Sequence, residues 1–347
     1  MFSTAVRYFR WPIFATIIGL MLSFWLGWTY TQNFSGAVTF LIIGTVLAIL
    51  EISLSFDNAI VNANKLKTMS PVWQRRFLTW GILIAVFGMR IIFPLAVVAI
   101  AAGIGPLATI RLAMAHPLDY AHIMQEAHLS VAAFGGSFLM MVALNYFIDE
   151  GKEVDWIRAL ERQLRRCASI RGLQITMVII VVLVVATMLP IHEVSRFLFA
   201  ALFGLVVFTG VEILGQVLDR ENETAQIVRA GGLGAFLYLE VLDASFSFDG
   251  VIGAFALTQN IFLIAIGLGI GAMYVRSMTI MLVENKTLAH LRYLEHGAFY
   301  SILALSIIMF AQTLWHIPEL ITGLIGVALI GIAFWSSLRY NKSRSPA

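Results

Sequence analysis

The sequence has little charge and almost no cysteine. Asp, Glu, Lys and Arg make up 12% of its 347 residues, whereas a soluble globular chain usually carries about 25%. The single cysteine, Cys167, excludes an internal disulfide and a cysteine-based zinc site. The net charge of +3 gives no electrostatic reason to expect a nucleic-acid partner. Motifs of the His-Glu-x-x-His, Gly-x-Ser-x-Gly and phosphate-loop types are absent, so we expect neither enzymatic activity nor a cofactor.

Long apolar segments dominate the chain instead. Hydrophobic residues make up 60% of it, and its mean hydropathy is +0.87. Apolar runs of about 20 residues, the length at which a helix crosses a bilayer, recur throughout. The sequence predicts an all-α integral membrane protein with about ten transmembrane helices. We expect them at approximately 13–30, 37–60, 77–101, 128–148, 173–190, 194–214, 232–258, 261–283, 297–316 and 319–338.

The first of these runs has two interpretations. Arg7 and Arg10 precede the apolar stretch 13–30, as basic residues precede the apolar part of a secretory signal peptide. The run is long, however, and no cleavage site with two small residues follows Thr29. We therefore expect an uncleaved transmembrane helix.

The positions of the basic residues predict the orientation in the membrane, because cytoplasmic loops carry an excess of Lys and Arg. With ten spans and a cytoplasmic N-terminus, 19 of the 23 basic residues lie in cytoplasmic segments. Only Arg111 and Arg196 lie outside, while Arg90 and Arg276 lie within spans. This predicts a multi-pass protein of the bacterial cytoplasmic (inner) membrane with both termini in the cytoplasm. The charged segment 149–172 is then expected to be a solvated connector.

Two octets of the same unusual pattern stand inside apolar segments. The first reads Glu51-Ile52-Ser53-Leu54-Ser55-Phe56-Asp57-Asn58, and the second reads Asp243-Ala244-Ser245-Phe246-Ser247-Phe248-Asp249-Gly250. A carboxylate inside a membrane span is costly and usually marks function. The repetition predicts an internally duplicated protein with two acidic half-sites.

The flanking sequence extends the duplication, since Gly81 precedes Arg90 by nine residues and Gly267 precedes Arg276 by nine. In the expected topology the two octet-bearing spans run in opposite directions. We therefore expect two inverted three-helix repeats, which in transporters meet at a substrate site near the midplane. The expected segments are an N-terminal helix (1–36), repeat 1 (37–148), a connector with two linking helices (149–231), repeat 2 (232–316), and a C-terminal helix with a basic tail (317–347).

The oxygen-bearing side chains of the octets are candidate ligands of a hard divalent cation. A helix break near the second serine of each octet would turn more oxygens inward, and in an unbroken helix Ser53 and Asp57 would share a face. The two arginines, Arg90 and Arg276, offset two of four acids, which leaves a charge that one divalent cation or two protons would neutralise. The candidate metal ligands are Glu51, Ser53, Ser55, Asp57, Asn58, Asp243, Ser245, Ser247 and Asp249.

These features favour a divalent-cation exporter that works by proton-coupled alternating access, with the metal ion, protons and the lipid bilayer as its partners. Other interpretations stay open. The pairs Asp57–Arg90 and Asp249–Arg276 could be buried ion pairs that only fix helix packing, and the serines could simply allow close helix approach. The protein would then be a non-transporting membrane component of metal, tellurite or envelope stress resistance. The sequence indicates no oligomeric state.

The motifs also resemble a known family. The patterns Glu51-x-x-Leu54-Ser55-x-Asp57-Asn58-Ala59 and Ser247-Phe248-Asp249-Gly250-Val251, with the glycine-to-arginine helices, are similar to the TerC family of bacterial membrane proteins. The run 294–298 resembles one branch of it, and the likeness covers about residues 37–148 and 232–338. TerC proteins are grouped with LysE-type transporters and are connected with tellurium resistance and Mn²⁺ export. The resemblance implies Mn²⁺ as the substrate, and acidic site positions at Glu51, Asp57, Asp243 and Asp249.

Overall fold

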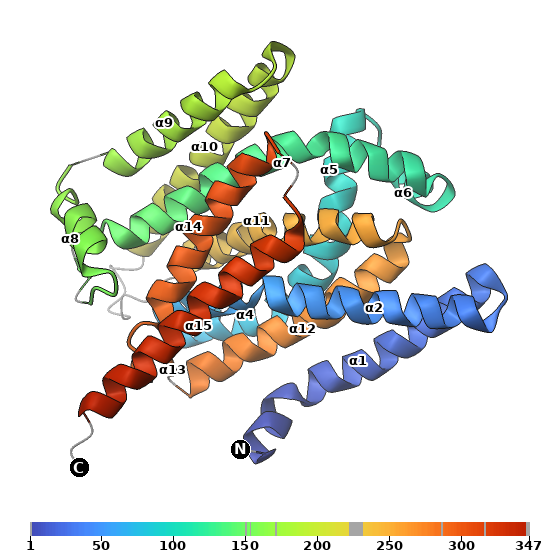
Figure 1. Cartoon of the computed structure of the whole chain (residues 1–347), viewed down its shortest axis with the longest axis horizontal. Coiled ribbons are helices and arrows are strands. Elements are labelled where there is room, and N and C mark those ends of the chain that lie inside the picture. Colours follow the sequence, from blue (N-terminus) through green and yellow to red (C-terminus); the bar gives the residue numbers. More distant parts are fainter. Residues whose placement is uncertain are drawn as a thin grey trace.

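The computed structural model describes residues 2–149, 151–152, 154–170, 172–221, 232–285, 287–315 and 317–344. Within these ranges it leaves out the side chains of residues 2–6, 78, 82, 215–216, 218–221, 248–249, 252, 256, 289, 319–320 and 343–344. All regular elements of the described part are helices (Figure 1). They are α1 (Phe2–Thr31), α2 (Phe34–Leu54), α3 (Phe56–Leu66), α4 (Pro71–Leu83), η1 (Ile84–Ile92), α5 (Phe93–Ala102), α6 (Pro106–Ala115), α7 (Pro117–Phe147), α8 (Arg158–Arg166), α9 (Leu173–Met188), α10 (Ile191–Glu221), α11 (Leu233–Leu257), α12 (Ile261–Glu284), α13 (Thr287–His290), α14 (Leu294–Gln312) and α15 (Glu319–Arg344).

Eight helices of the described chain are long and apolar enough to cross a bilayer, namely α1, α2, η1 with α5, α7, α10, α12, α14 and α15. The protein is therefore an all-α multi-pass membrane protein. Two further predicted spans are helical but differ from these eight. Helix α9 has only 16 residues, fewer than the roughly 20 needed to cross. Helix α11 has 25 residues, but any stretch of it long enough to cross contains Glu240, Asp243 and Asp249.

The first octet contains a helix break, and the second does not. Ser55 has φ −103° and ψ 14°, and it stands between the end of α2 and the start of α3. Helix α11 runs from Leu233 to Leu257 through the whole second octet. The break expected in both octets is therefore present only in the first.

The helix that carries Arg90 widens into a π-helix. The N–H of Phe93, at the end of η1, donates to the carbonyl of Gly88, five residues earlier. Pro94 follows directly; it has no N–H, and its ring would clash with the carbonyl of residue 90 in a regular α-helix. The proline thus accounts for the wider turn that presents Arg90.

Helices α7, α12 and α14 form the centre of the molecule. Helix α7 packs against α10 and α14, and α12 packs against α1, α2 and α3. The largest core cluster joins α3, α7, α10, α11 and α14 around fully buried Phe138, Phe147, Phe197 and Phe208. Lipid tails are as apolar as these side chains, so close packing holds the helices together more than exclusion of water does.

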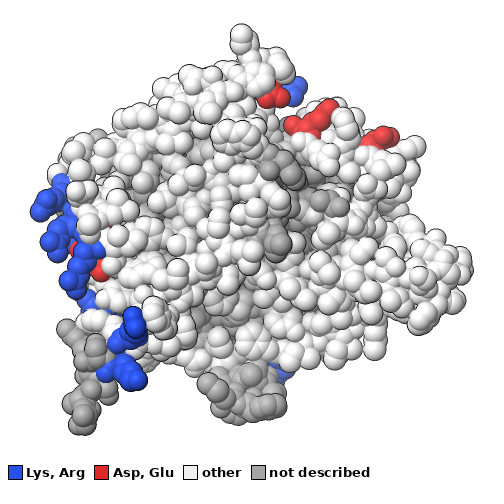
Figure 2. Space-filling view, viewed as in Figure 1, with Lys and Arg blue, Asp and Glu red and all other residues white. Residues whose placement is uncertain are grey.

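Charged side chains gather at the ends of the molecule. Figure 2 shows Lys and Arg concentrated over α8 and near the C-terminal end of the chain, whereas most visible Asp and Glu lie over the opposite, upper side. The faces between are largely uncharged, as expected for helices that lie in lipid.

Most described residues of the connector 149–172 are exposed or half-buried, as predicted for a solvated segment, but Glu161 is an exception. Glu161 of α8 is fully buried, and its carboxylate lies 2.7 Å from the Lys152 ammonium and 3.4 Å from Nε2 of His296 on α14. Burial of Glu161 acts to raise its pKa, but hydrogen bonds from His296, Lys152 and the N–H of Ile157 outweigh it and lower the pKa to about 2. This cluster fastens α8 to α14.

Candidate functional site

The two octets and the two arginines meet where α2, α3, η1, α11 and α12 pack together. All the polar side chains at this crossing are buried. They are Glu51, Ser55, Asn58, Asn62, Arg90, Glu240, Asp243, Ser247 and Arg276.

The octets contact one another reciprocally. The side-chain amide of Asn58, the last residue of the first octet, donates to the carboxylate of Asp243, the first residue of the second. At the last residue of the second octet, a Cβ on Gly250 would stand 2.9 Å from Oε2 of Glu51, the first residue of the first octet. A side chain at Gly250 would therefore displace the carboxylate of Glu51, which accounts for the difference between the octets at this position.

Arg90 bridges the two octets. Its guanidinium donates to Glu51 Oε1 of the first octet and to Ser247 Oγ of the second. Ser55 Oγ donates to the same Glu51 oxygen over 2.8 Å. One oxygen of Glu51 thus accepts hydrogen bonds from both Arg90 and Ser55, while the other faces Gly250.

Arg276 lies apart from this bridge, against an aromatic ring. Its guanidinium carbon sits 3.9 Å from the centroid of the Phe77 ring. Gly81 provides the space, since a Cβ there would meet Arg276 Nη2 at 2.5 Å and Glu240 Oε1 at 3.2 Å. In the described part of the chain, Arg276 Nη1 and both carboxylate oxygens of Glu240 form no hydrogen bond.

A small polar cavity lies between these groups. Its free volume is about 10 Å³, which is room for about one water molecule or one ion. Two of its lining oxygens, Asn58 Oδ1 and Asn62 Oδ1, are buried and have no hydrogen-bond partner among the described residues. The polar lining consists of Ser55, Asn58, Asn62, Arg90, Asp243, Arg276 and Thr279.

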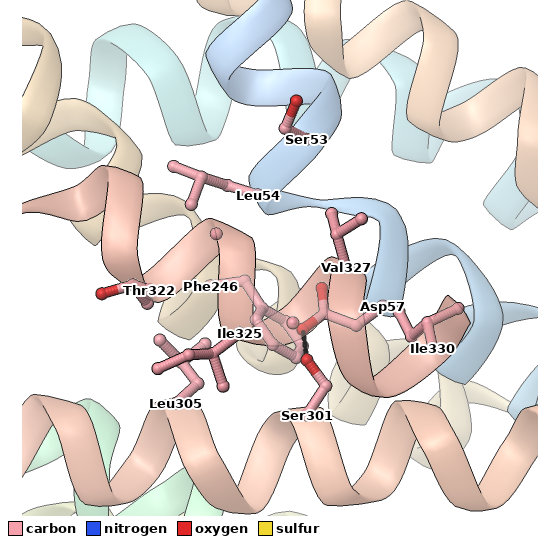
Figure 3. Close-up of a pocket in the computed structure, with 12 residues that line it drawn as sticks. Ser53, Leu54, Asp57, Phe246, Ser301, Leu305, Thr322, Ile325, Val327 and Ile330 are labelled. Carbon is pink, nitrogen blue, oxygen red and sulfur yellow. Dashed lines mark hydrogen bonds between the residues drawn. The ribbon is translucent and has the colours of Figure 1, made fainter. Parts of the chain in front are cut away.

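Asp57 lies outside this cavity. Its carboxylate accepts hydrogen bonds from Ser301 Oγ of α14 and from the N–H of Asn58, both over 2.8 Å. Figure 3 shows Asp57 and Ser301 facing one another in a separate pocket between the α2–α3 break, α14 and α15. Neighbouring residues of a helix point about 100° apart, so Asp57 and Asn58 serve different pockets.

Ser53 and Asp57 line the same pocket, but the convergence of their oxygens that an unbroken helix would give is not found. Ser53 Oγ donates to the carbonyl of Ile49 in its own helix over 2.9 Å, and in Figure 3 its hydroxyl points away from Asp57. The turn at Ser55 changes the direction of the chain between them, so the i, i+4 relation of an unbroken helix does not apply. The alternative pair Asp57–Arg90 is also wrong, because Arg90 binds Glu51.

Among the remaining predicted ligands, Ser55 and Ser247 lie at the crossing, whereas Ser245 Oγ donates to the carbonyl of Val241 in its own helix. The side chain of Asp249, and hence the pair Asp249–Arg276, lies outside the described residues. Sequence reasoning did not place Asn62 or Glu240 among the candidate ligands, although each stands one helical turn from a residue of an octet.

The described residues contain no group of three or more Asp, Glu, His or Cys side chains that could hold a metal ion. The oxygen ligands that the cavity offers are one carboxylate, that of Asp243, and neutral amide and hydroxyl oxygens, beside the guanidinium groups of Arg90 and Arg276. Hard cations such as Mg²⁺, Ca²⁺ and Mn²⁺ take such oxygen ligands. The donor set therefore fits a hard cation held by few charges better than it fits zinc or copper.

Comparison with known proteins corrects one expectation. The family model described as "Protein of unknown function (DUF475)" matches residues 56–344, and no curated protein or solved structure matches the chain. The resemblance to the TerC family is therefore wrong. It came from short motifs, and a buried acid flanked by serines and a small residue meets the same physical demands in unrelated membrane proteins. Mn²⁺ and tellurium resistance followed from that resemblance and are withdrawn with it.

Proposed function

Starting from the fact that the chain belongs to the DUF475 family, we propose that it is a transporter of a hard divalent metal cation. One observation carries the proposal. The cavity beside Asp243 has room for about one small ligand and is lined by two buried oxygens without a hydrogen-bond donor, those of Asn58 and Asn62. Unpaired buried oxygens are costly, and a bound cation would satisfy them.

The charge balance supports a divalent substrate. The buried acids with described side chains on α2, α3 and α11 are Glu51, Asp57, Glu240 and Asp243, and the buried Arg90 and Arg276 offset two of them. Two negative charges are left over, and uncompensated charges are expensive inside a membrane protein. One divalent cation neutralises them, and two protons do so after the cation leaves, so we propose exchange of the cation for protons.

Arg276 has a defined part in this proposal. It lines the cavity, it has an unpaired N–H group, and Glu240 lies beside it. Its guanidinium acts as a tethered positive charge that compensates the acids while no cation is bound. It moves towards Glu240 when a cation enters.

The reciprocal contact of the octets supports an inverted-repeat architecture with alternating access. The last residue of each octet lies against the first residue of the other, as a two-fold relation between the repeats requires. We further propose that α9 and α11 join the eight apolar helices as membrane-embedded elements. The Lys- and Arg-rich end seen in Figure 2 then faces the cytoplasm of a bacterium, with both termini on that side.

The test is transport by the purified protein in liposomes that contain a metal-sensitive dye and a pH dye. Mn²⁺, Mg²⁺, Ca²⁺ and Zn²⁺ are offered in turn on each side of the membrane. We expect movement of at least one of the first three cations, with opposite movement of protons. Asp243→Asn should lower the rate at least tenfold, whereas Asp119→Asn, at an exposed residue of α7, should not change it.

A different outcome would support the second interpretation, in which the polar cluster only fixes helix packing. The specific observation in its favour is that Arg90 already satisfies Glu51 and Ser247. If no cation moves in liposomes that contain folded wild-type protein, and Asp243→Asn changes only the yield and thermal stability, the transport proposal is rejected.

A further inference from the structure

An apolar groove far along the chain from the octets is open at the surface. It lies between α7, α8, α9 and α14 and has a volume of about 660 Å³. Residues along its length include Met140 on α7, Leu164 on α8, Met177 and Met188 on α9, and Leu303 on α14. None of the residues that line it is charged, so its occupant must be apolar over the length of the groove.

The groove is long and runs along the helices. On α9 it extends from Met177 to Met188, and a rise of 1.5 Å per residue makes this distance roughly 16 Å. Helix α9 itself has 16 residues, or roughly 24 Å, which is less than the roughly 30 Å thickness of the hydrocarbon layer. Such a length suits an extended acyl chain beside a helix that is too short to span the layer alone.

Helix α8, which borders one end of the groove, carries positive charge on its exposed face. Helix α8 presents Arg158, Arg162 and Arg166 at intervals of four residues, so they share one face, and all three are exposed. Leu160 and Leu164 stand on the opposite face of α8 and line the groove. Figure 2 shows the basic side chains gathered over this end of the molecule.

These arginines differ from the other charged groups of the connector. Arg165 pairs with Asp155 over 2.9 Å, and Lys152 pairs with Glu161 over 2.7 Å. By contrast, Arg158, Arg162 and Arg166 form no ion pair with any residue that the structure describes. An apolar face opposite a row of arginines is the pattern of a helix that lies in the membrane interface and attracts anionic headgroups.

We propose that the groove and the arginines of α8 form a binding site for one phospholipid with an anionic headgroup. An acyl chain fills the groove between α9 and α14. The phosphate and headgroup lie at the α8 end of the groove, where the long side chains of Arg158, Arg162 and Arg166 reach them from the exposed face of that helix. Arginine suits this role because its planar guanidinium donates paired hydrogen bonds to phosphate oxygens. The site shares no residue with the cavity beside Asp243, so it does not depend on the proposed transport function.

The test is native mass spectrometry of the full chain in detergent. Phosphatidylglycerol and phosphatidylcholine with identical acyl chains are added in turn. We expect a one-to-one adduct with phosphatidylglycerol at about tenfold lower lipid concentration than with phosphatidylcholine. The triple variant Arg158→Gln, Arg162→Gln, Arg166→Gln should lose this preference, whereas the matched variant Arg75→Gln, Arg339→Gln, Lys342→Gln should keep it.

A second variant tests the groove itself. Ile180 lines the groove and is 55% exposed, so Ile180→Trp should fill the groove without disturbing the core. We expect it to weaken the adduct with both lipids about equally, while the helical circular dichroism spectrum is unchanged. Equal binding of the two lipids by the wild type would show only the non-selective lipid shell of any membrane protein and overturn the proposal. Retention of the preference by the α8 triple variant would overturn it as well.

Discussion

The side-chain amide of Asn58 donates a hydrogen bond to the carboxylate of Asp243, a residue 185 positions further along the chain. This contact joins the end of the first octet to the start of the second. The hydrogen bond satisfies one carboxylate oxygen of Asp243. It also leaves the amide oxygen of Asn58 facing the cavity.

Replacing Asn58 tests this contact. Asn58→Ala leaves a buried carboxylate oxygen of Asp243 without its donor, which costs about 1–3 kcal/mol. We expect lower thermal stability in detergent and a loss of cation transport in liposomes. Asn341→Ala is a suitable control, because the Asn341 amide is exposed and donates only to the carbonyl of His290. Equal stability of the two variants would show that the Asn58 contact contributes nothing.

Gly250 provides a second test. A Cβ at this position would meet Glu51 Oε2 at 2.9 Å, so Gly250→Ala should displace the carboxylate and Gly250→Asn should displace it further. Ala normally stabilises a helix interior relative to Gly by about 1 kcal/mol. Gly210→Ala in α10, where nothing lies within 4 Å of the new Cβ, should show that gain in thermal unfolding, whereas Gly250→Ala should lower the unfolding temperature. Wild-type behaviour of Gly250→Asn would contradict the close approach of the Glu51 carboxylate to Gly250.

Variants of the pair Arg90–Glu51 distinguish an effect on stability from an effect on transport. Arg90→Gln leaves the Glu51 carboxylate buried without its cation and should destabilise the protein by about 3–5 kcal/mol. The double variant Arg90→Gln, Glu51→Gln removes both charges and should recover most of that loss. We expect the double variant to fold, as judged by size-exclusion chromatography, and to transport no cation. Active transport by the double variant would show that this pair serves packing alone.

Glu161 lies outside the membrane-spanning helices, and its lowered pKa predicts that the stability of the protein depends on pH. Its folded pKa, about 2, lies below its ordinary value of 4.5. A carboxyl group with a lowered pKa stabilises the fold above its ordinary value, and this contribution is lost as the pH falls through the folded value. Glu161→Gln should therefore cost about 3 kcal/mol at neutral pH.

Measurements of wild type and Glu161→Gln at acid pH test the direction of this pH dependence. The difference in unfolding temperature between wild type and Glu161→Gln should shrink as the pH falls from above 4.5 towards 2. Glu284→Gln serves as the control, because the contacts of Glu284 are exposed: an ion pair with Arg7 over 3.4 Å and a hydrogen bond from the Tyr8 hydroxyl over 2.8 Å. Exposed pairs contribute little. A difference for Glu161→Gln that stays constant with pH would contradict the ionised, buried state of this carboxylate.

The sequence predicts the helical membrane fold well, because hydropathy depends on local composition. It also predicts a helix break in the first octet, since the cluster of serines and Asn58 favours one. The same reasoning fails for the second octet. There Gly250 serves to admit the Glu51 carboxylate and does not end the helix, and this purpose becomes visible only when the partner helix is in place.

Side-chain pairing is harder to predict than helix position. Arg90 binds Glu51 and not Asp57 because η1 is a π-helix, which shifts the register of its side chains relative to an α-helix. Pro94 was the feature of the sequence from which the π-helix could have been predicted. The burial of Glu161 has no comparable local signal, because it depends on His296, which is 135 residues away in the sequence.

The contrast between Ser55 and α11 implies that the two halves of the molecule differ in stiffness. The backbone at Ser55 already departs from helical geometry, so α3 can swing relative to α2 at little cost in hydrogen bonds. Helix α11 contains no such break, so it must tilt as one continuous helix. Two sequences that are nearly alike therefore form a broken helix in one place and a continuous helix in the other, and we expect any motion that opens the proposed cation site to begin at Ser55.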